Sequence, residues 1–425
     1  MEERIIFHVD VNSAFLSWSA AYRVKVLGET TDLREIAAVV AGDKETRHSI
    51  ILAKSIPAKK YGIRTGEPLF QAMKKCSDLV VVQPDYPLYV KASRYFVEML
   101  RQFSPCVEQY SIDEAWMDMT GTQRLFGAPT LVAEMIRKRI YQELGFTVNI
   151  GISSNKLLAK MAGDLEKPNK VHTLFPCEIA QKMWPLPVRE LFCVGDATQE
   201  KLNRIGIYTI GELANADVRI LQKHLGKPGQ MIWLFANGRC ADGIVSEPPE
   251  NKGYGNSITA STDITKREQA YQILMGLCET VGMRLRKDYV CGSCVTVQLR
   301  TADFHRFSHQ SRLCGATNIT SELFYAVCRI FDEAWDGITP LRQLGVQVTH
   351  LAKEPYQQFD LFSELSPEQY DRKIRLNQTV DMLRDRFGED AIRRAKFARC
   401  CDGHMVGGLH KERRTGVTKP IPKEF

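Results

Sequence analysis

Three acidic residues follow or interrupt apolar segments, where an ionised carboxylate needs a compensating charge. Asp10 follows the nearly all-apolar run 5–9, and Asp113 and Glu114 lie near a turn within the alternating segment Val107 to Met119. Two Mg²⁺ ions about 3.5–4 Å apart would neutralise such a cluster and hold the attacking and leaving oxygens of a phosphoryl group in line. Taken singly, each acid is better explained as a cap for a nearby helix or turn. The combination of the three favours two-metal phosphoryl transfer.

These acids need a sheet to bring them together, and hydrophobic periodicity predicts one. Residues 5–10 are expected to form a short strand buried on both faces, and 107–119 two strands around a tight turn. Asn12 and Ser13 are expected to cap the next helix, and Ser55 to start another with proline in its first turn. The remaining elements expected here are strands at 36–40, 50–53, 79–82 and 147–150 and helices at 86–103 and 129–144. The order is an α+β plan with antiparallel pairing at the sheet centre.

The pattern changes after residue 176. Three prolines, at 176, 185 and 187, precede a run of short helices that ends near Gly238. A further unit opens near Tyr254. It is expected to contain a strand, a helix (268–287), a strand (294–300), a helix (320–335) and a strand (343–350), which resembles the order of a β-α-β-β-α-β domain. A charged helix at about 367–386 and a basic tail follow.

Length and composition suit a multidomain globular protein. The 425 residues exceed what one hydrophobic core usually organises. The net charge of +7, with a pI near 8.7, suits a polyanionic partner without requiring one. We find no signal-peptide core and no transmembrane run, which predicts a cytoplasmic protein with no membrane partner. The twelve cysteines are then expected to be free thiols. Cys291 and Cys294 are expected to be structural, because no second pair completes a zinc site.

Three blocks of sequence resemble the signatures of one enzyme family. Ile-Phe-His-Val-Asp-Val-Asn-Ser-Ala-Phe at 6–15 and Tyr-Ser-Ile-Asp-Glu-Ala at 110–115 look like the two catalytic motifs of the Y-family DNA polymerases. Gly-Ile-Ser-Ser-Asn-Lys-Leu-Leu-Ala-Lys-Met-Ala at 151–162, continuing to Lys-Pro-Asn at 167–169, is similar to a third signature block. The resemblance covers residues 1 to about 350. It is closest to the bacterial DNA polymerase IV and UmuC-like branch.

The resemblance implies an α+β multidomain, right-hand polymerase. The palm would comprise residues 1–12 and 80–175, the fingers 13–79, a helical thumb with helix-hairpin-helix elements 176–240, a β-α-β-β-α-β little finger 247–350, and a clamp-binding segment and C-terminal tail 351–425. Asp10, Asp113 and Glu114 would be the catalytic metal ligands, together with the backbone carbonyl of Val11, for two Mg²⁺ ions per active site. The primer 3′-hydroxyl would attack the α-phosphate of a deoxynucleoside triphosphate, and pyrophosphate would leave.

The family's nucleotide pocket can be carried over only in part. Phe15 stands at the steric-gate position, where a ring under the sugar excludes a 2′-hydroxyl; a plain core phenylalanine is the alternative. Lys167 matches the lysine of the third block and would bind the triphosphate. Lys59 stands where many relatives carry arginine, and Ile56 where they carry tyrosine. Lysine keeps the charge but not the planar fork, and isoleucine cannot donate a hydrogen bond.

Binding of primer-template DNA is expected from the thumb and from basic residues of the little finger. The stretch 191–202, with Gly195 and Lys201, resembles a helix-hairpin-helix in which Cys193 replaces one of two usual glycines. Gly226, Lys227 and Gly229 would form the second thumb element. Each stretch alone could equally be a loop between packed helices. Candidate phosphate contacts in the little finger are Arg284, Arg286, Lys287, Arg300, Arg306 and Arg312.

A short segment beyond the little finger resembles a tether. Gln358-Phe359-Asp360-Leu361-Phe362 matches the sliding-clamp-binding pentapeptide of bacterial relatives. Leu361 and Phe362 would be its apolar anchors, and Gln358 would fix the register. Binding to a ring on the DNA would offset a weak intrinsic grip.

The sequence therefore predicts a monomeric, template-directed DNA polymerase for low-fidelity translesion synthesis without proofreading. Two alternatives stay open. One is another two-metal enzyme on a similar palm, such as a nuclease or a nucleotide cyclase. The other is a catalytically weak clamp- and DNA-binding scaffold derived from a polymerase, which the changes at Ile56 and Lys59 would suit.

Overall fold

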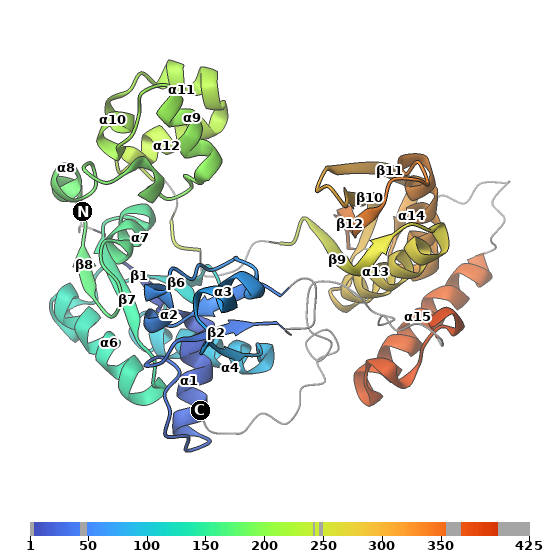
Figure 1. The fold of residues 1–425 in the computed structure, drawn as a ribbon, viewed down its shortest axis with the longest axis horizontal. Helices are drawn as coiled ribbons and strands as arrows, with labels where there is room; N and C mark the ends of the chain where they lie inside the picture. Colours follow the sequence, from blue (N-terminus) through green and yellow to red (C-terminus); the bar gives the residue numbers. More distant parts are fainter. Residues whose placement is uncertain (1–3, 43–48, 241–242, 246–249, 354–366, 398–425) are drawn as a thin grey trace. The chain divides into compact units, whose positions relative to one another are not determined.

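The structure is a computed structural model that describes residues 4–42, 49–240, 243–245, 250–353 and 367–397. The described residues fall into two compact units, one within 4–245 and the other within 250–397. The elements of both units are labelled in Figure 1. No helix in the described ranges is both long enough and apolar enough to span a membrane.

A five-stranded sheet forms the centre of the first unit, in the order β5-β6-β1-β7-β8. Its strands are β1 (Ile6–Val11), β5 (Val107–Gln109), β6 (Glu114–Asp118), β7 (Val148–Ser153) and β8 (Val171–Thr173). The central strand β1 is antiparallel to both of its neighbours, and all six of its residues are buried. The antiparallel sheet centre expected from the sequence is confirmed.

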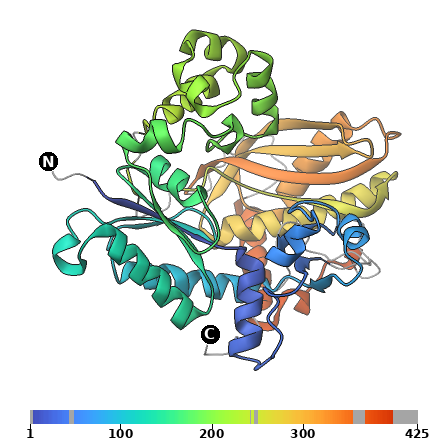
Figure 2. The same ribbon diagram turned by 60° about the vertical axis from the view of Figure 1, so that its left-hand side comes forward.

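The two faces of this sheet carry different chemistry because side chains alternate along a strand. Phe7, Val9 and Val11 join an apolar core with helices α4 (Tyr86–Arg101) and α6 (Pro129–Leu144). His8 and Asp10 belong to the opposite alternation, on the side of helix α7 (Lys156–Asp164). Figures 1 and 2 show α6 and α7 on opposite sides of the sheet.

Helix α7 packs directly on the backbone of β7. A Cβ atom on Gly151 would lie 1.9 Å from the carbonyl oxygen of Ala159, so only glycine fits at this contact. The Asn155 side chain caps the helix by accepting a hydrogen bond of 2.9 Å from the Leu158 amide. The close approach carries the lysines of α7 to the edge of the carboxylate cluster.

A smaller three-stranded sheet has the order β3-β2-β4. It contains β2 (Ala38–Ala41), β3 (Ile51–Lys54) and β4 (Val80–Val82), with helices α1 (Ala14–Lys25), α2 (Ile56–Lys60) and α3 (Leu69–Lys75) nearby. Strands β2 and β3 pair antiparallel, and they confirm the strands expected at 36–40 and 50–53. The strand expected at 79–82 is β4, which lies at the edge of this sheet with Val80 exposed and Val82 buried.

The start of α1 differs from the expectation. Ser13 occupies the N-cap position with φ 48°, and its side chain makes no capping hydrogen bond. The Asn12 side chain instead donates to the Thr147 hydroxyl at 3.2 Å. By contrast, Ser55 caps α2 as expected, accepting from the Ala58 amide at 3.1 Å.

Short helices follow around their own apolar core, which includes Leu202, Leu213, Leu221 and Ile232. They are α8 (Ile179–Lys182), α9 (Asp196–Arg204), α10 (Ile210–Asn215), α11 (Val218–Leu225) and α12 (Lys227–Ala236). The short helix α5 (Gln123–Phe126) comes earlier in the chain and packs on the core of the five-stranded sheet through Phe126. The run from α8 to α12 confirms the short helices expected up to about Gly238.

The second unit has the expected β-α-β-β-α-β order, which includes one strand, at 306–317, beyond the three that periodicity predicted. Its elements are β9 (Gly253–Ile264), α13 (Arg267–Lys287), β10 (Cys291–Thr301), β11 (Arg306–Thr317), α14 (Thr320–Ala334) and β12 (Leu341–Ala352). The strands form one antiparallel sheet in the order β11-β10-β12-β9. Cys291 and Cys294 are both buried in β10.

The charged helix expected near 367–386 is α15 (Pro367–Phe387), and it belongs to this second unit. Arg286 on α13 binds Asp381 on α15 through Nε at 2.5 Å and Nη2 at 3.0 Å. Arg384 donates to Glu279 at 2.5 Å, and both side chains are at least 97% buried. Arg394 binds the other oxygen of Glu279. Buried ion pairs therefore join the C-terminal helix to α13.

Candidate active site

Strand register brings the three acids together. Asp10 lies directly opposite Glu114 across the β1–β6 pair. The Val11 amide donates to the Asp113 carbonyl at 3.0 Å, which places Asp113 beside the end of β1. A cavity of about 580 Å³ is lined by Asp10, Val11, Asp113 and Glu114. Phe15, Lys59 and Lys167 line the same cavity, so residues from four separate segments converge as expected.

Asp10 is paired with Lys167. The Lys167 ammonium donates to Asp10 Oδ2 and also lies 2.8 Å from Asp164 Oδ1. Burial raises the pKa of Asp10 to about 6, against the opposing effect of Lys167. Burial alone would lower the pKa of Lys167, but the charges of Asp10 and Asp164 hold it above its usual value. The charge of Lys167 therefore offsets part of the cost of burying the Asp10 carboxylate.

Glu114 is held on one side by Lys160, whose Nζ lies 2.5 Å from Oε1. The Ser111 hydroxyl lies 2.6 Å from Asp113 Oδ1 and 3.5 Å from Glu114 Oε2. His8 Nε2 lies 3.8 Å from Glu114 Oε1. Burial, and then the charge of Lys160, lower the pKa of His8 well below its usual value, so this ring is neutral.

The donor set fits hard divalent cations such as Mg²⁺. Carboxylate and backbone carbonyl oxygens are the ligands that such ions prefer, and these are the groups that Asp10, Val11, Asp113 and Glu114 supply. In the described part of the chain, no three His, Cys, Asp or Glu side chains are arranged together as ligands. Two lysine ammonium groups contact the acids instead. The cluster therefore requires positive charge, and its chemistry suits a cation.

An aromatic ring, Phe15, lines the cavity beside the acids and packs on further aromatic side chains. Phe15 stacks on Tyr89 with a centroid distance of 4.6 Å and an interplanar angle of 14°. Trp18 and Tyr86 contact Phe15 at centroid distances of 6.0 and 6.2 Å. The ring is only partly buried and lines the cavity, so its position is fixed while one side remains accessible.

Cations surround the rest of the cavity. Lys59 and Ile56 are exposed on α2, and Lys54 lies on β3. Burial, and then the charge of Lys59, lower the pKa of Lys54. Arg34 also lines the cavity, held by Asp32 at 2.6 Å and by the Gly145 carbonyl at 2.6 Å. The sequence did not single out Arg34 or Lys160 as site residues. Lys160 binds Glu114, which lies 46 residues away in the sequence. Arg34 belongs to none of the recognised motifs, and its contact with Gly145 spans 111 residues.

The thumb residues lie outside this cavity. Gly195 is the N-cap of α9, and Lys201 is exposed in the last turn of that helix. Cys193 adopts φ 71°, a conformation that favours glycine, so the turn keeps the backbone of the glycine that it replaces. Gly226 and Lys227 begin α12 and are exposed. Gly229 has a packing role, because a Cβ there would lie 2.4 Å from the Leu221 carbonyl oxygen.

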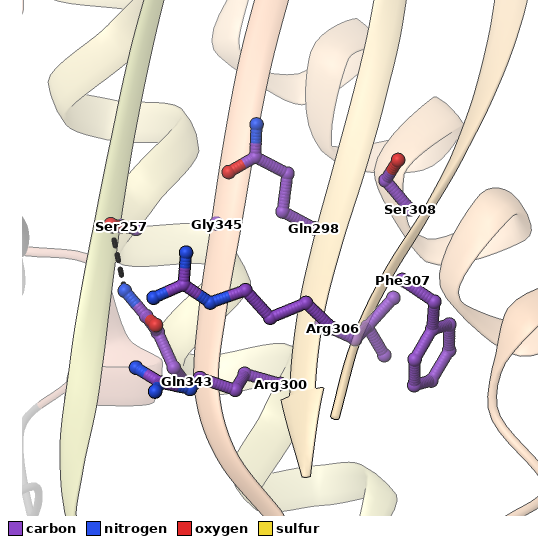
Figure 3. A pocket seen from close by; sticks show the side chains of 9 residues that line it. Ser257, Gln298, Arg300, Arg306, Phe307, Ser308, Gln343 and Gly345 are labelled. Atoms are coloured by element: carbon purple, nitrogen blue, oxygen red, sulfur yellow. Dashed lines mark hydrogen bonds between the residues drawn. The ribbon is translucent and has the colours of Figure 1, made fainter. Parts of the chain in front are cut away.

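The sheet face of the second unit carries part of the expected arginine set. Arg300 and Arg306 extend across the sheet and line a cavity of about 400 Å³ with Gln298, Gln343 and Ser257 (Figure 3). Burial, and then the neighbouring charges of Arg306 and Arg342, lower the pKa of Arg300. The expectation that Arg286 contacts phosphate is not supported, because Asp381 occupies its guanidinium and its side chain is 92% buried.

The proposed clamp-binding residues Gln358, Leu361 and Phe362 lie outside the described residues.

Comparisons with known proteins agree with this arrangement. The model of the impB/mucB/samB family matches residues 9–164, and that of the impB/mucB/samB family C-terminal domain matches residues 251–361. The model described as "DNA polymerase-iota, thumb domain" matches residues 189–239. A solved structure titled "Y-family DNA polymerase chimera Dbh-Dpo4(243-245)-Dbh" has a TM-score of 0.68 at 20% identity, covering 82% of this chain and all of that one. The fold is therefore that of a Y-family polymerase.

Curated relatives are similar over nearly the whole chain. The "DNA polymerase IV" of Clostridium acetobutylicum is 45% identical over 392 residues, 92% of this chain and 98% of the relative. The "DNA polymerase IV" of Acetivibrio thermocellus is 37% identical, over 92% and 97% of the two chains. The "DNA polymerase IV 2" of Bacillus subtilis is 36% identical, over 93% and 95%. The chain belongs to the Y-family of DNA polymerases, in its bacterial DNA polymerase IV branch.

Proposed function

We propose that this chain extends a DNA primer by two-metal nucleotidyl transfer, with Asp10, Asp113 and Glu114 as the metal-binding carboxylates. The observation that carries the proposal is the direct pairing of Asp10 with Glu114 across β1 and β6, beside Asp113, in one cavity with Phe15 and Lys167. Bound Mg²⁺ would lower the charge barrier between the primer hydroxyl and the triphosphate. DNA-directed DNA polymerase activity is the activity of the family to which the chain belongs.

Other residues of the cavity orient the carboxylates, bind the triphosphate and select the sugar. Ser111 holds the Asp113 carboxylate through its 2.6 Å hydrogen bond, which limits that ligand to one orientation. Lys167 and Lys59 bind the triphosphate, and Lys167 leaves Asp10 when it does so. Phe15, held by Tyr89, packs under the sugar and excludes a 2′-hydroxyl. The backbone carbonyl of Val11 completes the oxygen donors.

DNA is bound by surfaces outside the cavity. Residues 1–12 with 80–175 act as the palm, 13–79 as the fingers, 176–240 as the thumb and 247–350 as the little finger. The exposed Lys201 and Lys227, with the turns at Gly195 and Gly226, contact phosphates, while Gly229 keeps α12 close to α11. Arg300 and Arg306 contact phosphates from the sheet face of the second unit.

The enzyme works as a monomer in the cytoplasm, and Gln358, Leu361 and Phe362 bind a sliding clamp. It copies damaged templates at low fidelity and has no proofreading activity.

Primer extension tests the proposal. Purified full-length chain, Mg²⁺ and one deoxynucleotide at a time are incubated with a primer on a plain or an abasic template. We expect template-matched addition on the plain strand, insertion opposite the abasic site, and no shortening of the primer when nucleotides are omitted. No extension at all would favour the scaffold alternative, and primer shortening that survives purification would contradict the absence of proofreading.

A further inference from the structure

Two lysines one helical turn apart on α7 are paired with two acids of the β5–β6 hairpin. Lys156 Nζ lies 2.7 Å from Glu108 Oε1, and Lys160 Nζ lies 2.5 Å from Glu114 Oε1. The pairs look equivalent, but only Glu114 faces Asp10 in the strand register. Lys156 therefore offers an internal comparison for whatever Lys160 does.

Lys160 cannot leave its acid easily. Its side chain is only 10% exposed, and its ammonium lies over the rings of Tyr110 and Phe192 at 5.9 and 5.5 Å. Lys167, which pairs with Asp10, is 38% exposed and shares its charge with Asp164. The enclosed lysine is thus a fixed part of the cluster, whereas the exposed lysine is free to move to an arriving anion.

The contacts of Glu114 are divided between its two oxygens. Oε1 receives the Lys160 ammonium and faces His8 Nε2 at 3.8 Å. Within the described residues, the hydrogen-bond partner of Oε2 is the Ser111 hydroxyl at 3.5 Å, on the side of Asp113. Lys160 therefore holds one oxygen of Glu114 and leaves the other on the side of Asp113, which also lines the cavity.

We propose that Lys160 is a positioning residue that orients Glu114 for cation binding and remains in contact with it when the cation is bound. This inference rests on the proposed function of the carboxylate cluster. Groups that orient a metal ligand typically change metal affinity by about 10- to 100-fold when they are removed. On electrostatic grounds alone, removing a positive charge beside a cation site should strengthen cation binding. A role for Lys160 in orienting Glu114 predicts the opposite, that its removal weakens cation binding.

Mn²⁺ binding to the full-length chain, without DNA or nucleotide, tests this inference. Free Mn²⁺ is measured by electron paramagnetic resonance in titrations of the wild type, Lys160→Met, Lys156→Met and Lys167→Met. We expect Lys160→Met to weaken binding by about tenfold or more and Lys156→Met to leave it unchanged. Lys167→Met should strengthen binding, by about threefold or more, because that lysine competes with the cation for Asp10. Unchanged or tighter binding in Lys160→Met would overturn the inference.

Two further variants keep the result interpretable. Phe192→Leu leaves every charge in place but removes part of the aromatic surface around the Lys160 ammonium, and we expect it to weaken Mn²⁺ binding as Lys160→Met does. If Lys160→Met does not fold, Phe192→Leu provides the test. Unchanged Mn²⁺ binding in Phe192→Leu would then contradict the inference. Asp113→Asn tests the carboxylate site itself. Normal Mn²⁺ binding by Asp113→Asn would reject the metal site, whatever the lysine variants do.

Discussion

Asp10 and Glu114 lie opposite each other in a buried sheet, and each is neutralised by a lysine from the segment 156–170. Lys167 is more exposed than Lys160 and has two acidic partners. The enclosed Lys160 therefore suits a fixed contact with Glu114, and the more exposed Lys167 suits binding of an arriving anion. At the scale of residues, the cavity is organised by the need to keep buried carboxylates charged.

Phe15 provides a residue-scale test of sugar selection. Phe15→Ala should raise ribonucleotide insertion relative to deoxynucleotide insertion by on the order of a hundredfold, because the ring stacked on Tyr89 no longer occupies the space beneath the sugar. Single-nucleotide insertion kinetics with matched ribo- and deoxyribonucleotides measure the ratio. Phe70→Ala is a suitable control, since Phe70 is exposed on α3 outside the cavity. Retained ribonucleotide exclusion in Phe15→Ala would show that Phe15 is a packing residue only.

At the scale of elements, short connections position the reactive groups. The Ser55 hydroxyl accepts from the amides of Ala58 and Ala38, both at 3.1 Å, and donates to the Ile36 carbonyl at 2.7 Å. One buried side chain thus joins the start of α2 to β2. Helix α2 carries Lys59, so this cap also places a cation of the cavity.

Ser55→Ala should therefore affect both stability and nucleotide use. Loss of the cap and of the buried hydrogen bonds should cost about 1–3 kcal/mol of unfolding free energy, and the KM for the nucleotide should rise. Denaturant unfolding and steady-state kinetics give the two values. Ser77→Ala, at an exposed serine before β4, should change neither. A stable Ser55→Ala protein with an unaltered KM would argue against this role of the cap.

Local sequence predicted these elements well, and long-range partners account for most of the differences. The expected helix at 129–144 coincides with α6, and periodicity predicted both helices and three of the four strands of the second unit. It did not predict β11, in which polar side chains interrupt the apolar alternation. The prediction that Arg286 contacts phosphate is not supported, because its guanidinium is bound by Asp381, 95 residues away in the sequence. Ser13 looked like a cap, but its left-handed backbone prevents the usual hydrogen bond. Lys160 belongs to the third signature block, but no role of its own could be predicted from the sequence, because its partner Glu114 lies on a distant strand, β6.

At the scale of the whole molecule, the C-terminal helix is part of the second unit. Arg384 and Glu279 bury opposite charges between α15 and α13, and Arg394 also binds Glu279. Burial acts to raise the pKa of Glu279, but Arg384 and Arg394 hold it below its usual value. This pair contributes stability above the ordinary glutamate pKa, and the contribution is lost as pH falls through the lowered one.

Arg384→Met should destabilise the second unit by about 3–5 kcal/mol at neutral pH, because it leaves a buried glutamate with one exposed partner. The penalty should shrink in acid as Glu279 takes up a proton. Urea unfolding at neutral and acidic pH measures both effects. Arg386→Met, at an exposed neighbour on the same helix, should change stability little. An equal and small effect of both substitutions would contradict a structural role for the buried pair.

The clamp segment is expected to act only on long-range synthesis. Replacing Leu361 and Phe362 with alanine should leave single-nucleotide insertion unchanged but abolish stimulation by a sliding clamp loaded on a primed circle. Product-length distributions with and without the clamp measure this. Equal stimulation of the wild type and the double variant would show that these residues do not bind the clamp.

Single-nucleotide insertion by Asp113→Asn tests the central claim most directly. Asp118→Asn is the matched control, because Asp118 lies on the same strand, β6, but pairs with Arg4 and not with the acid cluster. With saturating DNA and Mg²⁺, we expect Asp113→Asn to lose at least about a thousandfold in rate and Asp118→Asn to retain the wild-type rate within about twofold. Insertion by Asp113→Asn at a rate close to that of Asp118→Asn would contradict the assignment of the catalytic carboxylates.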